Sequence, residues 1–302
     1  MSAVPRVLVV GGTGAQGGSV MRHLLEEGRV RVRCMTRRLD SLAAQSLADA
    51  GAEVVEGDMA DRESLDAALA GCEAAFGVTN YFEHFDREYE LGARFIDAVV
   101  DSAVEHLVLS TLPSASELSG GRLEVPVFEH KARLEALARQ HEIVATFVHV
   151  SFYYENFIHN SPPRLQADGS YAFGFPMGER PFSAVSVSDI GGVVAAILRE
   201  PRAFQGRTVK IAGDQLPAAE YAAIIGAVTG RQVRYQYIPR AVFATLPIPG
   251  APELADMFEL FRSYVSADPA DLELSRRLFP AMRRFEQWAS DEREALLAAM
   301  EP

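Results

Sequence analysis

The chain has 302 residues, 48% of them hydrophobic and 23% charged, with two cysteines and a formal net charge of −12. This is the composition of a globular protein with a sizeable core. The charge argues against nucleic acid or an anionic membrane surface as a partner. No apolar run approaches about 18 residues, the opening MSAVPRVLVV is too short for a signal peptide, and two cysteines make no disulfide framework, so we expect a cytoplasmic protein.

The first 150 residues alternate short apolar runs with amphipathic helical segments. The apolar runs, which we predict to be strands, are 6–10, 30–35, 52–55, 74–78, 106–110 and 143–150. Strands that alternate with helices form a parallel sheet covered on both faces, joined by right-handed crossovers. The pattern predicts an α/β fold in which residues 1–150 form a doubly wound, Rossmann-like domain.

From about residue 151 the rhythm changes. Residues 160–182 are rich in proline, glycine and turn-forming residues, and they precede further helices and short strands near 208–211 and 233–238. We interpret residues 151–302 as a smaller α+β region, packed where open sheets bind ligands, at the carboxyl ends of the strands.

A glycine-rich turn follows the first predicted strand. Gly11, Gly14 and Gly17 are spaced G-x-x-G-x-x-G, a variant of the dinucleotide-binding fingerprint. In such a turn the first glycine permits the tight bend, the second lets a pyrophosphate approach the backbone, and the third lets the helix pack on the strand. The alternative is a glycine turn without a ligand. Its position between a strand and a helix favours the dinucleotide.

The end of the second predicted strand indicates which dinucleotide. An NAD site usually carries an acid there, but this chain has Arg37 and Arg38, whose guanidinium groups suit a 2′-phosphate. The alternative is a solvated loop; we predict NADP(H). Asp58 and Met59 follow the third strand, where a loop would border the adenine, although Asp58 is equally suited to cap a helix.

These motifs together resemble the NmrA-like group of atypical short-chain dehydrogenase/reductases, and within it the branch named for the human redox sensor HSCARG. The matching segments are GGTGAQGGSV, the TR after the second strand, EVVEGDMAD, VTNY, HK and YYENF, in that order. The VTNY and YYENF segments are the more specific ones, and the resemblance covers nearly the whole chain.

The resemblance implies a set of cofactor contacts along the chain. They are Gly11, Gly12, Thr13, Gly14, Ala15, Gln16, Gly17, Arg37, Asp58, Met59, Thr79, Asn80, Tyr81, Lys131, Tyr153, Tyr154, Glu155 and Asn156. Thr79 to Tyr81 would border the nicotinamide-side ribose, and Tyr153 to Asn156 would lie near the nicotinamide. A lysine that some members carry after TNY is Gly92 here, so one phosphate contact is in doubt.

The proton donor that reductases of the wider superfamily use is absent. They place a tyrosine four residues before a lysine, but the residue four before Lys131 is Val127. Lys131 remains a catalytic candidate because the chain has only two lysines, the other being Lys210, so an arginine would be expected at an unconstrained surface position. The alternative is a solvated lysine on a helix.

Other acids could replace the missing tyrosine. Tyr81, His130, His149, Tyr153 and Tyr154 follow or end predicted strands, and for each of them core packing or surface exposure is the competing interpretation. We retain Tyr81 and Tyr153 as candidate catalytic residues beside Lys131. No metal-ligand spacing occurs.

Two functions remain open. One is an NADPH-dependent oxidoreductase acting on a small apolar substrate beneath the aromatic segment 152–182. The other is a non-catalytic NADP(H) redox sensor that acts through a protein partner. The missing tyrosine favours the sensor, whereas the lysine and the aromatic segment favour the enzyme, and the balance favours the enzyme. The sequence leaves open whether the protein forms a homodimer.

Overall fold

A computed structural model describes residues 4–141 and 143–301, which divide into two compact units. The sheet unit comprises the described chain up to Ser114, Val127–Val150 and Val187–Lys210. The aromatic unit comprises Ala115–Pro126, Ser151–Ser186 and the described chain from Ile211. This division differs from the predicted boundary after residue 150. Residues 115–126, before that boundary, belong to the aromatic unit, and residues 187–210, after it, belong to the sheet unit.

The returning segment 187–210 belongs to the sheet unit for a physical reason. Helix α9 (Val187–Arg199) packs closely on α1 (Ala15–Glu27). Ser19 Oγ donates to the carbonyl of Ser188 at 2.8 Å, and the amide of Gly191 donates to Ser19 Oγ at 2.9 Å. A Cβ at Gly191 would lie 2.2 Å from the carbonyl oxygen of Ser19, so only glycine permits this approach.

The core of the sheet unit is a seven-stranded sheet, with strand order β11-β6-β5-β4-β1-β2-β3. Its strands are β1 (Arg6–Val10), β2 (Arg31–Thr36), β3 (Glu53–Glu56), β4 (Ala74–Gly77), β5 (His106–Thr111), β6 (Ala145–Val150) and β11 (Thr208–Ile211). The pairs from β3 through β1 and β4 to β6 are parallel. The predicted Rossmann-like sheet is therefore confirmed, and strand order reverses between β1 and β4.

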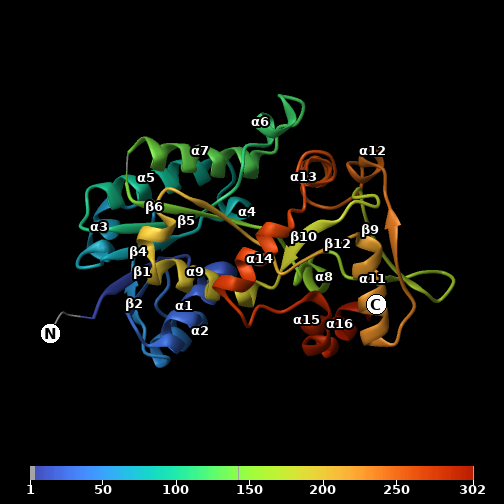
Figure 1. Cartoon of the computed structure of the whole chain (residues 1–302), viewed down its shortest axis with the longest axis horizontal. Helices are drawn as coiled ribbons and strands as arrows, with labels where there is room; N and C mark the ends of the chain where they lie inside the picture. The colour runs from blue at the N-terminus through green and yellow to red at the C-terminus, as the bar shows by residue number, and fades with distance from the viewer. Residues whose placement is uncertain (1–3, 142, 302) are drawn as a thin grey trace. The chain divides into compact units, whose positions relative to one another are not determined.

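Helices cover both faces of this sheet. Figure 1 shows α3 (Arg62–Leu69), α5 (Glu88–Val100) and α7 (Pro126–Gln140) on one side and α1 and α9 on the other. The first group packs on the strands through a core that includes Leu8, Leu65, Phe95 and Leu134. Shorter elements complete the unit: α2 (Leu42–Asp49), α4 (Tyr81–His84), the 3-10 turn η1 (Phe85–Arg87) and α10 (Pro201–Phe204).

Two small sheets and several helices make up the aromatic unit. One sheet has the order β12-β10-β7 and the other β13-β9-β8. The strands are β7 (Phe152–Tyr153), β8 (Arg164–Leu165), β9 (Tyr171–Phe175), β10 (Phe182–Val185), β12 (Asp214–Leu216) and β13 (Val233–Tyr237). The helices are α6 (Ala115–Ser119), α8 (Asn156–His159), α11 (Ala218–Thr229), α12 (Arg240–Phe243), α13 (Ala251–Ser263), α14 (Pro269–Leu278), α15 (Phe285–Asp291) and α16 (Arg293–Met300).

Aromatic side chains fill the core of this unit. The Phe175 ring stacks on Phe258 with centroids 4.7 Å apart, and Phe157 packs edge-on to Phe285 at 5.4 Å. Phe157, Phe175 and Phe285 are fully buried, and each such pair adds about 0.5–1.5 kcal/mol beyond the area that it buries. The aromatic residues of segment 152–182, expected to cover a substrate, largely pack against one another.

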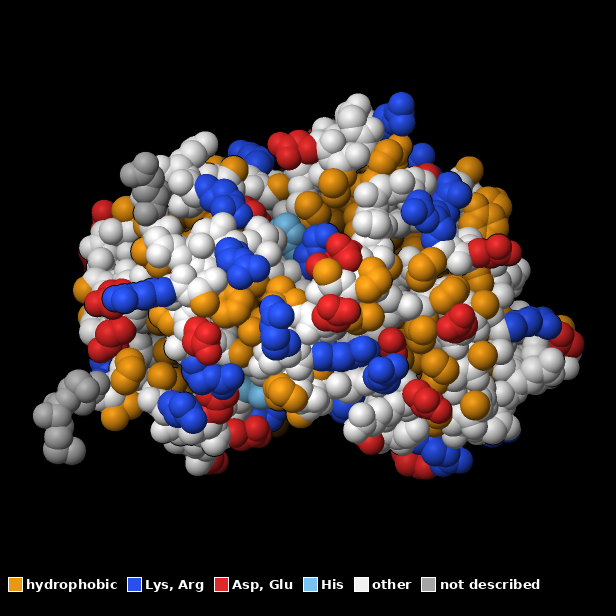
Figure 2. Space-filling view, in the orientation of Figure 1, with side chains coloured by type: hydrophobic (Ala, Val, Ile, Leu, Met, Phe, Trp, Pro, Cys, Tyr) orange, Lys and Arg blue, Asp and Glu red, His pale blue; other side chains and the backbone are white. Residues whose placement is uncertain are grey.

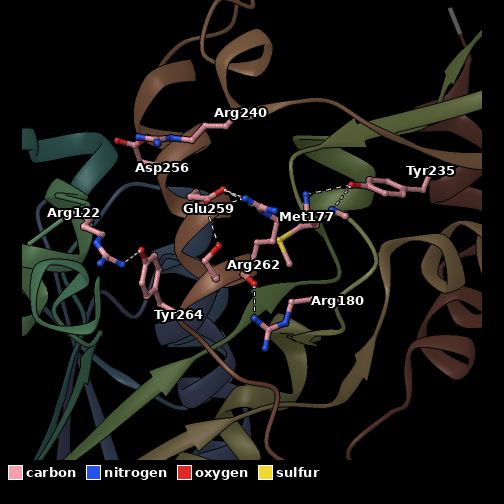
Figure 3. A network of polar contacts seen from close by, with 11 residues as sticks. Arg122, Met177, Arg180, Tyr235, Arg240, Asp256, Glu259, Arg262 and Tyr264 are labelled. Atoms are coloured by element: carbon pink, nitrogen blue, oxygen red, sulfur yellow. Dashed lines mark hydrogen bonds and ion pairs between the residues drawn. The ribbon is translucent and has the colours of Figure 1, made fainter. Parts of the chain in front are cut away.

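Polar contacts join helix α13 to its neighbours in the same unit, as Figure 3 shows. The Arg262 carbonyl accepts a hydrogen bond from Arg180 at 2.9 Å, and within α13 the Arg262 side chain pairs with Glu259 at 2.7 Å. Arg240 pairs with Asp256 at 2.6 Å. The Arg240 and Arg262 side chains are 46% and 39% exposed. Ion pairs at such exposed positions contribute little to stability, so these contacts mainly fix the local geometry.

The surface carries charges of both signs. On the face shown in Figure 2, acidic and basic side chains are interspersed. Among the described residues, no helix has both the length and the apolar character that a membrane span requires.

Candidate functional site

The glycine turn lies at the carboxyl end of β1, where the strand order reverses. Gly11 has φ +80°, a conformation that L side chains rarely adopt, and its carbonyl accepts a hydrogen bond from the Gly14 amide at 3.0 Å. A Cβ on Gly17 would lie 2.2 Å from that same carbonyl oxygen, and a Cβ on Gly12 would lie 2.6 Å from Cys34 Sγ. The fold itself therefore requires Gly11, Gly12 and Gly17.

Gly14 differs from these three glycines. It is exposed, has extended backbone angles, and a Cβ there would meet only the Gly11 carbonyl oxygen, at 3.3 Å. It immediately precedes α1, whose N-terminus has no side-chain cap, so the amides of the first turn from Ala15 remain directed outward without an intrahelical acceptor. The turn therefore presents uncapped amides beside Gly14, a glycine that packing only mildly restricts. Helix N-termini of this kind bind phosphate groups. Thr13 is exposed in the same turn.

The polar end of β2 lies beside the turn in the sheet. Arg37, half-exposed, forms an ion pair with Glu83 of α4. This hydrogen bond with Glu83 is the main cause of a raised Arg37 pKa. Asp58 Oδ1 accepts from the amide of Ala60 at 2.8 Å and so stabilises the turn before α3, whereas the cap of that helix is Asp61, so Asp58 is not the helix cap. Met59 is half-buried against the core of the sheet unit.

A buried polar cluster follows β4 on the other side of β1. Lys131 Nζ donates to Glu88 Oε1 at 2.7 Å, and to both the carbonyl and the Oγ1 of Thr79 at 2.9 Å. Thr79 Oγ1 in turn donates to Glu88 Oε1 at 2.7 Å. Glu88 is fully buried, and Lys131 and Thr79 are nearly so. The alternative of a solvated lysine is therefore wrong: Lys131 is one half of a buried ion pair.

The ammonium group of Lys131 has three hydrogens, and the three acceptors account for all of them. Burial lowers the Lys131 pKa from its ordinary value, and the Glu88 carboxylate opposes that shift. In this arrangement Lys131 holds the Thr79 segment in place. It would reach a ribose only by releasing one acceptor.

Glu88 was not a predicted site residue, although the sequence carries a signal for it. Glu88, Leu91 and Phe95 lie on one helical face of α5, and all three are buried. A carboxylate on an otherwise apolar face needs a cationic partner, which Lys131 supplies. Its second oxygen, Oε2, has no hydrogen bond among the described residues and faces His130 Nδ1 at 3.6 Å.

Tyr81 opens α4 after Asn80 and is half-buried. Its ring packs edge-on to His130 at 5.6 Å and to Phe85 at 5.7 Å. The structure thus brings three residues of the predicted set, Thr79, Tyr81 and Lys131, into one cluster with Glu88 and His130. Asn80 is exposed beside them and donates from Nδ2 to Glu83 Oε2 at 3.5 Å.

Two further polar contacts lie where β5 and β6 end. Ser110 Oγ donates to Gln16 Oε1 at 2.8 Å, which ties the first turn of α1 to β5. Glu135 accepts from Thr111 Oγ1 at 2.6 Å and contacts His149 Nε2 at 2.9 Å. Burial raises the pKa of Glu135, but hydrogen bonds from His149, Thr111 and Arg139 outweigh this and bring it to about 2. His149 is therefore engaged by a carboxylate.

The YYENF residues lie in the aromatic unit, and their contacts there are structural. Tyr154 is fully buried, with its ring 5.0 Å from Phe285 and 5.3 Å from Trp288. Glu155 Oε1 accepts from Ser186 Oγ at 2.8 Å. Asn156 begins α8 and its Oδ1 accepts from Asn160 at 2.7 Å, while half-buried Tyr153 pairs with Val185 across β7 and β10. Of these, Tyr154 has no exposed surface for a ligand.

A cavity of about 250 Å³ in the aromatic unit is lined by none of the predicted site residues. Its lining is Tyr171, Arg231, Glu294, Leu297, Ala298, Met300 and Glu301. Within residues 4–141 and 143–301, no group of three or more histidine, cysteine, aspartate or glutamate side chains is arranged to hold a metal ion. We place the candidate site on the sheet unit, because the predicted residues that the structure brings together, Thr79, Tyr81 and Lys131, lie there.

Comparison with known proteins gives consistent relatives. The sequence model of the NmrA-like family matches residues 4–289. An NmrA-like family domain-containing protein of Dictyostelium discoideum is 31% identical over 242 residues, covering 77% of this chain and 80% of its own. An NmrA-like family domain-containing oxidoreductase, hkm9 of Aspergillus hancockii, is 32% identical over 280 residues, covering 86% and 83%.

Solved structures share the fold at lower identity. The negative transcriptional regulator NmrA in complex with NADP has a TM-score of 0.82 at 21% identity, covering 97% of this chain and 98% of its own. The NADPH-dependent quinone oxidoreductase QOR2 of Escherichia coli, complexed with NADPH, has a TM-score of 0.80 at 22% identity, covering 94% and 99%. With the family match over residues 4–289 and relatives above 30% identity, the chain belongs to the NmrA-like family.

Proposed function

We propose that the protein is an NADP(H)-dependent oxidoreductase acting on a small molecule, with the dinucleotide bound along the carboxyl ends of β2, β1 and β4. The observation that carries this proposal is the convergence of three features on neighbouring strands. The uncapped glycine turn follows β1, Arg37 follows β2, and the Thr79–Lys131 cluster follows β4. Open α/β sheets bind dinucleotides at this reversal of strand order.

The residues present fit such a cofactor. Gly14 and the amides that begin α1 would hold the pyrophosphate, Arg37 the 2′-phosphate, and Asp58 and Met59 the adenine side. Thr79, Asn80 and Tyr81 would border the nicotinamide-side ribose. The relatives named oxidoreductases, and the quinone oxidoreductase of the same fold complexed with NADPH, support the assignment.

Bound NADPH would supply a hydride, and this chain must supply the rest. We assign to Lys131 a positioning role, because its three hydrogens hold Thr79 and Glu88. Tyr81 is the candidate proton donor of the sheet unit, since its ring lies in the same cluster and it is partly exposed at the start of α4. Tyr153 of the aromatic unit remains the second candidate.

The test is NADPH consumption with quinones, enones, imines and aldehydes. We expect at least one class to be reduced, and Tyr81→Phe to lower kcat about a hundredfold, the typical contribution of a general acid. Tyr154→Phe is the matched control and should leave kcat unchanged. Rates are compared at saturating NADPH, where a defect in cofactor binding no longer affects them.

A specific observation favours a second function, the NADP(H) sensor. Val127 stands where the wider superfamily has its catalytic tyrosine, and Lys131 is engaged by protein acceptors. A sensor would bind NADPH, reduce none of the four substrate classes, and bind a partner protein differently with NADPH and with NADP⁺. That combination of results would replace the oxidoreductase by the sensor.

A further inference from the structure

Arg37 has one side-chain partner among the described residues, and that partner is an acid. Its guanidinium forms an ion pair with Glu83, and the two side chains are 53% and 43% exposed. A guanidinium fork binds carboxylate and phosphate oxygens with the same donors. Glu83 engages one nitrogen of that fork, Nη2, so a 2′-phosphate that bonds to the same nitrogen must compete with Glu83 for it.

Glu83 belongs to a segment that is only weakly attached to the core. Helix α4 is four residues long and has no buried residue, and Phe82 is 62% exposed. Phe85, which follows it, has φ +44°, the one positive φ at a non-glycine residue in the part of the chain described. Such a turn can change conformation without opening the core.

A second carboxylate at the end of this segment provides the contrast. Glu88, just after η1, holds Lys131, so the acids at 83 and 88 each engage one of the two cations assigned to the site. The Glu88 pair is buried and would leave an uncompensated charge if it separated, whereas the Glu83 pair faces water and separates at little cost. Of the two pairs, the Arg37–Glu83 pair is the one that a ligand can exchange.

We propose that Glu83 competes with the 2′-phosphate of the cofactor for Arg37, and so sets how strongly the site prefers NADP(H) to NAD(H). The proposal rests on the cofactor site assigned above. NADH has no 2′-phosphate, so it leaves the pair intact and is indifferent to Glu83. The 2′-phosphate of NADPH must displace Glu83 from Arg37, and it then lies near the negatively charged Glu83 carboxylate. Glu83 therefore lowers the affinity for NADPH alone.

Calorimetric titration of Glu83→Gln with both cofactors tests this. An exposed ion pair contributes about 0.2–1 kcal/mol, so we expect NADPH to bind about 2–5-fold more tightly and NADH to bind unchanged. Glu90→Gln is the matched control, since Glu90 pairs with Arg94 and is similarly exposed at 49%. It should change neither affinity.

A double-mutant cycle separates competition for Arg37 from simple charge repulsion. In an Arg37→Gln background, Glu83→Gln should give little further gain for NADPH, because the contested group is gone. An unchanged ratio of NADPH to NADH affinity in Glu83→Gln overturns the inference, as does an equal gain in the Arg37→Gln background or in Glu90→Gln. A wild-type protein with no preference for NADPH would instead overturn the assignment of Arg37, and the inference with it.

Discussion

The two units bury different kinds of side chain. The sheet unit buries ionisable groups. Glu88 and Lys131 are buried beside the segment that follows β4, and His106 is buried at the start of β5. The aromatic unit buries rings, with Tyr154 and Trp288 among its fully buried side chains. Buried charge is costly unless a fixed partner compensates it, whereas buried rings contribute directly to stability. The difference shows which unit is organised around polar chemistry and which is organised around packing.

The same comparison distinguishes two tyrosine-containing segments that look alike in the sequence. The YYENF segment and the VTNY segment both carry tyrosine and polar residues after strands. In the structure Thr79 and Tyr81 join the polar cluster, while Tyr154 is inside the aromatic core. Local residue types alone do not separate these outcomes, because they depend on which distant rings pack against each tyrosine.

The largest effect should come from breaking the buried ion pair. Lys131→Met leaves Glu88 buried without a cation, and we expect a loss of about 3–5 kcal/mol in the free energy of unfolding, measured by urea denaturation. The double variant Lys131→Met/Glu88→Gln should lose less than Lys131→Met alone, since no buried charge remains.

The control lies in the aromatic unit, where Glu155→Gln changes a half-buried carboxylate bonded to Ser186. We expect it to cost about 0.5–1.5 kcal/mol, the usual net worth of one hydrogen bond. If Lys131→Met cost no more than Glu155→Gln, or if the double variant were the least stable of all, the contrast between the units would be lost.

The next effect concerns His106, buried at the start of β5. Thr146 Oγ1 donates to the Phe204 carbonyl, so it accepts a hydrogen bond from His106 Nε2 at 2.9 Å. Burial lowers the His106 pKa from 6.5 to about 4. Between these pH values His106 binds a proton in the unfolded chain but not in the native state. The free energy of unfolding therefore falls as the pH falls from 6.5 to 4, by up to about 3 kcal/mol.

His106→Gln keeps a donor to Thr146 but does not titrate. Denaturation at pH 7 and at pH 4.5 should show a smaller loss of stability on acidification for this variant than for the wild type. Glu135 stabilises the native state by its lowered pKa, and this stabilisation is lost over a lower pH range, between its ordinary pKa of 4.5 and about 2. The effects of His106 and Glu135 on stability can therefore be separated by pH. Parallel pH profiles for variant and wild type would contradict the assignment to His106.

The smallest effect is expected at Tyr154. Because its ring is fully buried in the aromatic core, Tyr154→Phe should keep the packing and change both the free energy of unfolding and the NADPH dissociation constant little, the former by about 1 kcal/mol or less. Calorimetry and denaturation of the same preparation measure both. A large loss of NADPH affinity without a loss of stability would return Tyr154 to the cofactor site.

Much of the sheet unit could be predicted from the sequence, because its strands are nearly continuous apolar runs and its glycines are fixed by local geometry. The six predicted strands before residue 151 correspond to β1–β6, with ends that differ by at most two residues. The ion pairs at Glu83 and Glu88 could not be predicted, since their cationic partners lie 46 and 43 positions away in the chain. The aromatic unit was hardest, because its short strands carry no long periodic pattern.

The central claim is that the glycine turn of the sheet unit holds the pyrophosphate of NADP(H). Titration of NADPH into Gly14→Val, compared with the wild type and with Gly18→Ala in the helix that follows, tests it most directly. A Cβ on Gly18 would make an ordinary van der Waals contact, 3.4 Å from the Gly12 carbonyl oxygen, so that variant should bind like the wild type. We expect Gly14→Val to fold, as judged by its melting temperature, and to bind NADPH at least about a hundredfold more weakly, a loss of about 2.7 kcal/mol. A folded Gly14→Val that binds NADPH as the wild type does would contradict the account.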